Sequence, residues 1–150
     1  SLNSKSRVLD IGCAKGFIVK DLSDELNNNN IFGLDISDYA LKNCHPDVIG
    51  KLHKGSAEKL PFPDNSFDLV ISLDTIHNLP RNKVIIALKE IERVTKKDSF
   101  IKVDSYLNED QKKIFENWVL TAKYHNYPKK WLEVFKEAGF NGDYYWTIIE

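Results

Sequence analysis

Residues 8–16 read VLDIGCAKG, a short apolar run that passes directly into a glycine-rich turn. After Gly16, apolar residues recur at helical spacing as far as Leu26, so this stretch predicts a strand, a tight turn and a helix. Glycines in such a turn allow a ligand to approach the backbone closely. The stretch therefore predicts an α/β fold with a ligand site at the carboxyl end of its first strand.

Strands and helices alternate along the rest of the chain. The apolar run at 67–73 is the clearest strand, and its near-continuous apolar character is typical of a strand buried on both faces of a parallel sheet. The other expected strands cover residues 31–35, 48–54, 99–104 and 144–149; a short helix follows Ser37, and longer helices cover 83–97, 108–119 and 128–138. This alternation predicts a mostly parallel sheet whose ligand binds outside the carboxyl ends of the strands.

The three longer helices in the second half of the chain each carry an apolar face that we expect to point into the core. The expected inward residues are Val84, Leu88 and Ile91 in the first, Ile114, Phe115 and Trp118 in the second, and Trp131, Leu132 and Phe135 in the last. For the two tryptophans, core packing is expected ahead of a role in an acceptor pocket.

Size and composition exclude several classes of protein. The 150 residues predict a single domain at 1–150, and a hydrophobic content of 42% is enough for a core. Lysine plus arginine number 21 against 22 acidic residues, so the chain lacks the basic surplus that nucleic-acid binding requires. No apolar run approaches the ~18 residues of a membrane span, and the first residues lack a signal peptide's apolar stretch, so a cytoplasmic location is expected. Cys13 and Cys44 are expected to be free thiols.

The spacing of the glycines separates the cofactor classes. A dinucleotide fingerprint that starts at Gly12 needs glycines at positions 14 and 17, where this chain has Ala14 and Phe17. A Walker loop ends in Gly-Lys-Ser/Thr, whereas Phe17 follows Gly16 directly. The turn therefore disfavours NAD and excludes ATP bound by a Walker loop.

Several segments, in the same order along the chain, resemble the class I S-adenosylmethionine (SAM)-dependent methyltransferases. They are DIGCAKG at 10–16, Asp35 at the end of the second strand, GSAEKLPF at 55–62, DNSFDLV at 64–70, IHNL at 76–79, EIERV at 90–94 and EAGF at 137–140. The resemblance covers nearly the whole chain and implies a Rossmann-like, mostly parallel sheet with helices on both faces. One departure is KKDS at 96–99, where the family usually turns with Lys-Pro-Gly-Gly.

The resemblance also assigns cofactor-binding residues. They are Asp10, Gly12, Cys13, Gly16, Asp35, Ile36, Ser56, Ala57 and Glu58. Backbone groups of the glycine turn are expected at the amino acid end of SAM, with Asp10 accepting from the ammonium group directly or through water. Asp35 is expected to accept from both ribose hydroxyls, in a charge-assisted contact that is stronger than a neutral one. Ile36 is expected to pack on the adenine face, with residues 56–58 at the adenine edge.

Candidate catalytic residues follow the fourth and fifth strands. They are Asp74, His77 and Asp104. His77 is the first choice for a general base because histidine titrates near neutral pH. Asp74 and Asp104 resemble the paired acids of metal-dependent catechol methyltransferases, but two carboxylates without a third clear ligand do not predict a metal site. We therefore expect no metal.

The acceptor is expected to be a small molecule, because no Asn/Asp-Pro-Pro-Tyr segment of the amino-methylating DNA and glutamine enzymes follows the fourth strand. The tail at 122–146 is similar to methyltransferases of bacterial surface-sugar biosynthesis, which suggests a sugar or nucleotide-sugar. A quinone-type acceptor is the alternative within this class. A SAM-binding or interaction module without catalysis is the alternative from another class, because cofactor binding and turnover use different residues.

The region before the first strand is the second departure from the family. The family carries helices there that cover the cofactor, whereas only residues 1–6 precede the strand here. We therefore expect a chain shortened at its N-terminus, or a module completed by another chain, that binds SAM weakly by itself.

Overall fold

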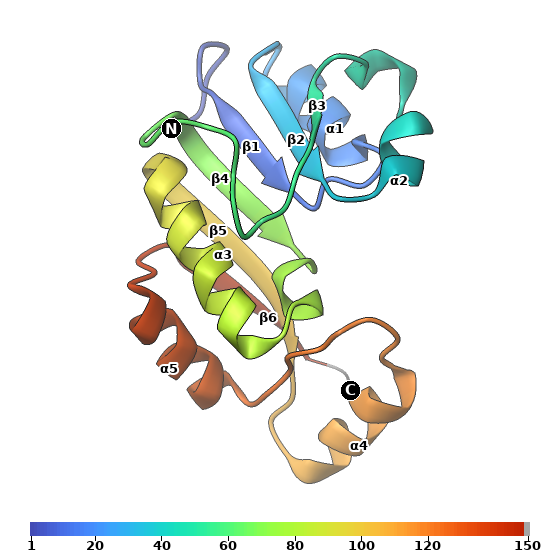
Figure 1. The fold of residues 1–150 in the computed structure, drawn as a ribbon, viewed down its shortest axis with the longest axis vertical. Helices are drawn as coiled ribbons and strands as arrows, with labels where there is room; N and C mark the ends of the chain where they lie inside the picture. The colour runs from blue at the N-terminus through green and yellow to red at the C-terminus, as the bar shows by residue number, and fades with distance from the viewer. Residues whose placement is uncertain (149–150) are drawn as a thin grey trace.

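Six parallel strands form one sheet in the computed structural model, which describes residues 1–148 (Figure 1). The strands are β1 (Val8–Ile11), β2 (Ile31–Asp35), β3 (Leu52–Lys54), β4 (Phe67–Leu73), β5 (Thr95–Ser105) and β6 (Asp143–Ile148). Their order across the sheet is β3-β2-β1-β4-β5-β6. The strand order reverses between β1 and β4, which is the position where ligands bind in sheets of this kind.

Helices cover both faces of the sheet, as predicted (Figure 1). They are α1 (Phe17–Glu25), α2 (Asp38–Lys42), α3 (Arg81–Val94), α4 (Glu109–Trp118) and α5 (Pro128–Ala138), with 3-10 turns at Pro46–Val48 and Ile76–Asn78. Successive residues of β1 point to opposite faces, so Leu9 packs in the core beneath α3 and α5 while Val8 packs with Val19 of α1. Every residue of β1 is therefore buried.

Strand β5 begins earlier than the sequence pattern predicts. Helix α3 ends at Val94, and Thr95 already pairs with β4, so the prediction of a helix as far as Lys97 is wrong. The turn expected at residues 96–99 is strand instead. Lys97 forms an ion pair with Asp68 of β4 at 3.0 Å, which ties the extended segment to its neighbouring strand.

Helix α4 buries one side chain, Phe115, which lies against Tyr106 and His125. The exposed fractions of Ile114 and Trp118 are 46% and 62%, so the prediction that they point into the core is wrong. The reason is the position of α4, which projects beyond the carboxyl end of the sheet rather than lying across its face (Figure 1).

Helix α5 packs against the sheet through a face that the sequence pattern predicts in part. Trp131 and Phe135 are buried as predicted, but Leu132 is 43% exposed and Val134 takes the inward position. Residues 131, 134 and 135 share one face of a helix with 3.6 residues per turn, whereas residue 132 lies beside it. The predicted inward residues of α3 are all buried: Val84, Leu88 and Ile91.

The third strand is shorter than the predicted 48–54, because Pro46 begins a 3-10 turn that occupies Pro46–Val48. Ile149, the predicted end of the last strand, lies outside the described residues. Both cysteines are free thiols, as predicted. No helix within residues 1–148 is both long and apolar enough to cross a membrane.

Candidate active site

A cavity of about 390 Å³ opens at the carboxyl ends of β1, β2 and β4, where the strand order reverses. We call it the Asp35 cavity. Its lining residues are Ile11, Gly12, Leu34, Asp35, Ile36, Gly55, Ser56, Ala57, Glu58, Leu73, Asp74, Thr75, Asn78 and Leu79. Six of the predicted cofactor-binding residues are among them: Gly12, Asp35, Ile36, Ser56, Ala57 and Glu58. The segments that resembled a methyltransferase in the sequence therefore meet at one cavity.

Gly12 is required at its position by both conformation and space. Its φ is +83°, a left-handed conformation that side chains disfavour, and a Cβ there would lie 2.0 Å from the Thr75 hydroxyl oxygen. The N–H groups of Gly12 and Cys13 both donate to the Leu34 carbonyl, at 2.8 and 3.1 Å. The N–H of Gly16 donates to the Cys13 carbonyl at 2.8 Å. These N–H groups are therefore used inside the protein and are not free for the carboxylate of a ligand, whereas a ligand ammonium group would donate to carbonyl oxygens of the turn.

Asp35 fixes the glycine turn and the start of α2 through its carboxylate. One oxygen accepts from the Ala14 N–H and the other from the Ser37 N–H, each at 2.8 Å. These bonds orient the carboxylate at the cavity wall while each oxygen keeps a second lone pair for a ligand hydroxyl. The next residue, Ile36, is 71% exposed at the cavity, where it offers an apolar surface for a flat ring.

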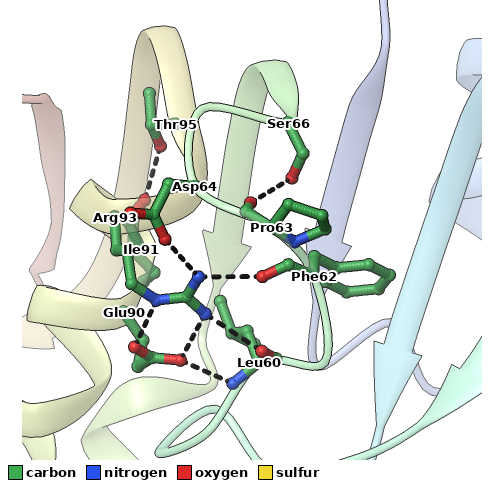
Figure 2. A network of polar contacts seen from close by, with 9 residues as sticks. All are labelled: Leu60, Phe62, Pro63, Asp64, Ser66, Glu90, Ile91, Arg93 and Thr95. Atoms are coloured by element: carbon green, nitrogen blue, oxygen red, sulfur yellow. Dashed lines mark hydrogen bonds and ion pairs between the residues drawn. The ribbon is translucent and has the colours of Figure 1, made fainter.

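The segment that follows β3 is held by Arg93 of α3 (Figure 2). The Arg93 guanidinium donates to the carbonyl oxygens of Leu60 and Phe62 at 3.0 and 2.8 Å. The same group donates to the carboxylates of Asp64 and Glu90. The planar fork of arginine makes several directed bonds at once, which a lysine does not provide.

Glu90 completes this anchor from the other side of the segment. Its carboxylate accepts from the Leu60 N–H at 2.7 Å, so the carbonyl and the N–H of one residue are both held by α3 (Figure 2). Glu58, which lines the Asp35 cavity, pairs with Lys83 of the same helix at 3.2 Å. Helix α3 therefore positions the wall of the cavity that residues 56–58 form.

Asp10 lies behind the cavity rather than among its lining residues. It is 2% exposed, and its Oδ2 has no hydrogen-bond partner among the described residues. Burial and, to a lesser degree, the nearby Asp35 carboxylate together raise the pKa of Asp10 to about 7. The predicted contact of Asp10 with a ligand ammonium stays a prediction, and the unpartnered buried oxygen is the feature that favours it.

Cys13 and Gly16 also lie outside the lining of the cavity. Cys13 is 6% exposed, and burial raises the pKa of its thiol to about 12. The thiol is therefore protonated near neutral pH, which excludes a nucleophilic role. Gly16 has a φ of +80°, and a Cβ there would lie 2.7 Å from a methyl group of Val48. Both residues serve the shape of the turn.

A second cavity, of about 540 Å³, adjoins the first. We call it the His77 cavity. Its lining residues are Asp74, His77, Lys102, Asp104, Trp118, Val119, Leu120, Thr121 and Thr147. All three predicted catalytic residues line it, and Asp74 lines the Asp35 cavity as well. The two cavities therefore meet at Asp74.

His77 and Asp104 form a buried pair at the base of the second cavity. His77 is 4% exposed, and its Nδ1 accepts from the Asp104 N–H at 3.3 Å and lies 3.8 Å from the carboxylate. Burial lowers the pKa of His77, with Asp104 acting in the opposite direction, and burial raises the pKa of Asp104. An Nδ1 that accepts a hydrogen bond assigns the proton to Nε2, which then donates rather than accepts. The base role of His77 stays a prediction, and this bond weighs against it.

Asp74 adopts a left-handed conformation with a φ of +53°, which is uncommon for a residue with a side chain. Its Oδ2 accepts from the Lys102 ammonium group at 2.7 Å, and its N–H donates to the Lys102 carbonyl at 2.9 Å. Strained backbone of this kind clusters at functional sites. The structure thus fixes the Asp74 carboxylate at the junction of the two cavities.

Sequence reasoning missed several residues that line these cavities, among them Thr75, Lys102 and Thr147. Asn78 Oδ1 in the Asp35 cavity and Thr147 Oγ1 in the His77 cavity are buried and have no partner among the described residues. Buried polar atoms are normally hydrogen-bonded, so these two lack the partner that such atoms usually have. Within residues 1–148, no cluster of three or more histidine, cysteine or acidic side chains could hold a metal ion.

A glycine turn, an acidic residue at the end of β2 and a cavity where the strand order reverses define a nucleotide-binding α/β domain. The family model described as a methyltransferase domain matches residues 9–103, more than half of the chain. The chain belongs to this family of methyltransferase domains. SAM is the methyl donor that the family implies.

Three named relatives match this chain over part of their own length, and two of them are methyltransferases by name. The arginine-hydroxylase NDUFAF5 of Rattus norvegicus is 42% identical over 94 residues, covering 60% of this chain and 26% of that protein. A fatty-acid O-methyltransferase of Mycolicibacterium smegmatis is 33% identical over 91 residues, covering 59% and 32%. The 2-methyl-6-phytyl-1,4-hydroquinone methyltransferase of Synechocystis is 32% identical over 111 residues, covering 71% and 34%. The chain therefore spans a quarter to a third of the length of these relatives.

A solved structure shows the same fold. It is the methyltransferase bound to the Trm112 methyltransferase activator of Haloferax volcanii, with a TM-score of 0.76 and 23% identity. The superposition covers 92% of this chain and 62% of that one. The likeness confirms the predicted Rossmann-like fold of the class I methyltransferases.

Proposed function

We propose that residues 1–150 act as one SAM-dependent methyltransferase domain, which binds SAM in the Asp35 cavity and methylates a small molecule held in the His77 cavity. One observation carries the proposal: Asp74 lines both cavities, so a cofactor site and an acceptor site share a wall. A transfer reaction requires this juxtaposition, because a donor and an acceptor held side by side react in an effectively unimolecular step.

The residues of the Asp35 cavity fit the parts of SAM. Asp35 would hold the ribose hydroxyls, Ile36 would pack on the adenine, and residues 56–58 would face its edge. Gly12, which lines the cavity, would lie against the amino acid end of SAM. The buried oxygens of Asp10 and Asn78 that lack a protein partner are available to accept from polar hydrogens of the ligand.

The residues of the His77 cavity supply positioning and proton transfer. SAM would supply an activated methyl group at the junction of the cavities. Asp104 would accept the proton of the nucleophile, because burial raises the pKa of this carboxyl group and so makes it a stronger base. His77, with its proton on Nε2, would orient the nucleophile by donating a hydrogen bond, and the ion-paired Asp74 would fix the wall between donor and acceptor.

The walls of the His77 cavity favour an acceptor with an apolar body. Trp118, Val119 and Leu120 supply apolar surface to its lining, which also contains the charged residues Asp74 and Lys102. The names of relatives that act on a fatty acid and on a phytyl hydroquinone support an acceptor of this kind. We therefore propose a quinone-type or other amphipathic acceptor ahead of the sugar or nucleotide-sugar that the tail of the sequence suggested.

Two measurements test the proposal. Calorimetry with S-adenosylhomocysteine (SAH) and with NAD should give an affinity for SAH that is at least about tenfold higher, and equal affinities would contradict the cofactor assignment. Methyl-labelled SAM and a small-molecule cell extract should yield a labelled product whose formation survives EDTA. SAH binding without any labelled product would instead support a module that binds SAM without catalysis.

A further inference from the structure

Four large apolar side chains are exposed on and beside α4. They are Leu107 at 62%, Ile114 at 46%, Trp118 at 62% and Leu120 at 96%. We call them the α4 strip. Ile114 and Trp118 are four residues apart on α4, which places them on one face of the helix, whereas Leu107 and Leu120 lie just outside its two ends. Single exposed apolar residues are ordinary on a protein surface, whereas a group that shares one face marks a binding site.

The α4 strip borders the packing face of the same helix. Phe115 forms that face, fully buried against Tyr106 and His125, and the Trp118 ring lies at its edge, 6.2 Å from the Phe115 ring. Packing of the fold accounts for Phe115 but leaves most of the surface of the strip exposed. Helix α4 also projects beyond the sheet, so the strip lies on a part of the molecule that no other helix covers within residues 1–148 (Figure 1).

The strip is continuous with the His77 cavity. Trp118 and Leu120 belong to the strip and also line the cavity, together with the charged residues Asp74, Lys102 and Asp104. The lining of the cavity therefore combines charged groups with apolar residues that continue onto an exposed apolar surface. A ligand that matches this combination has a polar, proton-bearing end and a long apolar chain.

We infer that the acceptor is a single-chain lipid whose polar end enters the His77 cavity and whose apolar chain lies along the α4 strip. This inference rests on the proposed function and adds the position of the chain and a dependence on its length. Each methylene that the strip covers is worth about fourfold in affinity when fully buried, so a chain that spans only part of the strip binds less tightly. An acyl chain and an isoprenoid chain share this chemistry, and the test separates them.

Calorimetry in saturating SAH, below the critical micelle concentration, tests the inference. Dodecanoate is compared with hexanoate as the acyl pair, and farnesol with prenol as the isoprenoid pair. In at least one pair, the longer chain should bind about tenfold tighter or more. The pair that shows the larger ratio identifies the chain class.

Two variants locate the binding surface. Trp118→Ser and Leu120→Ser change exposed side chains, so the fold should be retained, and each should reduce the chain-length ratio at least about threefold. Leu132→Ser is the matched control, because Leu132 is a similarly apolar residue, 43% exposed on α5, and lines neither cavity. It should leave the ratio unchanged.

Three outcomes would overturn the inference while leaving the proposed function intact. They are equal affinities within both pairs, a length ratio that neither strip variant reduces, and a dimer in sedimentation that Leu120→Ser dissociates, since a second copy would then cover the strip. Failure of SAH itself to bind would contradict the proposed function instead.

Discussion

The Asp74 carboxylate and the Lys102 ammonium group lie 2.7 Å apart, Oδ2 to Nζ, where the Asp35 cavity meets the His77 cavity. Lys102 is opposite Leu73 in the register of β4 and β5, so the ion pair follows directly from strand pairing. The pair holds a carboxylate at the shared wall on a residue whose backbone is left-handed. A substitution that removes the charge of Asp74 but keeps this conformation therefore tests what the carboxylate does at the shared wall.

We expect Asp74→Asn to lower methyl transfer about tenfold or more while changing SAH affinity by less than about threefold. Asparagine tolerates the left-handed conformation and keeps the size of the side chain, so the loss reports the charge. Labelled-product formation and calorimetry measure the two quantities. Asp110→Asn is the control, because that side chain is 93% exposed. Normal turnover in Asp74→Asn would show that the Asp74 charge has no role in the reaction.

We expect Asp35→Asn to weaken SAH binding about tenfold or more, because a hydrogen bond to a charged group contributes about 1.5–3 kcal/mol. The substitution also removes one of the two acceptors for the Ala14 and Ser37 N–H groups, so thermal unfolding must be followed in parallel. Asp38→Asn changes an exposed acid on α2 that lines neither cavity and should bind SAH normally. Unchanged affinity in Asp35→Asn would contradict the placement of the ribose.

Arg93→Ala should destabilise the chain by about 1–3 kcal/mol, because it leaves the Leu60 and Phe62 carbonyls without their donor. The ion pairs add little to this value, since the Arg93 side chain is 31% exposed and solvent screens them. Arg93→Lys should recover little of the lost stability, because one ammonium group cannot make the several directed hydrogen bonds of the guanidinium group. Lys89→Ala, exposed on the same helix, is the control.

SAH affinity should fall together with stability in Arg93→Ala, because the segment it anchors continues into residues 56–58 of the Asp35 cavity. Denaturant unfolding and calorimetry check the two effects. A variant that loses stability but binds SAH normally would show that this anchor does not position the cavity wall.

The raised pKa of Asp10 predicts that the stability of the fold depends on pH. Its pKa is raised to about 7 in the folded chain by burial and by Asp35, above the value of about 3.9 expected when unfolded. Its stabilising contribution is therefore fully present below about pH 4 and is lost as pH rises through about 7. Asp10→Asn should thus gain stability relative to the wild type between pH 5 and pH 8, on the order of 2–4 kcal/mol.

Denaturant unfolding at several pH values measures this difference, with Asp110→Asn as an exposed control. A constant difference between Asp10→Asn and the wild type across this range would show that Asp10 is ionised throughout. SAH should bind more tightly as pH rises through about 7, because an ammonium group favours the ionised carboxylate.

Local sequence signals predicted the Asp35 cavity well. Gly12 directly follows β1 and Asp35 is the last residue of β2, so the pairing of these two strands brings both residues to the same edge of the sheet. The conformational need for glycine at position 12 is likewise local. This part of the site could be predicted because its residues lie at the ends of neighbouring strands.

The His77 cavity was predicted only in part, because its walls come from segments far apart in the chain. Asp74 and Asp104 end adjacent strands and could be paired from the sequence, whereas Lys102 reads as an ordinary strand lysine. The apolar character of Trp118 predicted that its side chain is buried in the core. Its exposure depends instead on where α4 lies relative to the sheet. Phe115 alone among the apolar residues of α4 is buried, against Tyr106 and His125, and helical periodicity does not show which apolar residue takes that place.

A crystal structure of the chain with SAH tests the central claim most directly. The account predicts the ribose hydroxyls within hydrogen-bond distance of the Asp35 carboxylate and the adenine between Ile36 and residues 56–58, with the sulfur directed toward Asp74. SAH bound in any other cavity, or with its adenine away from Ile36, would contradict the account.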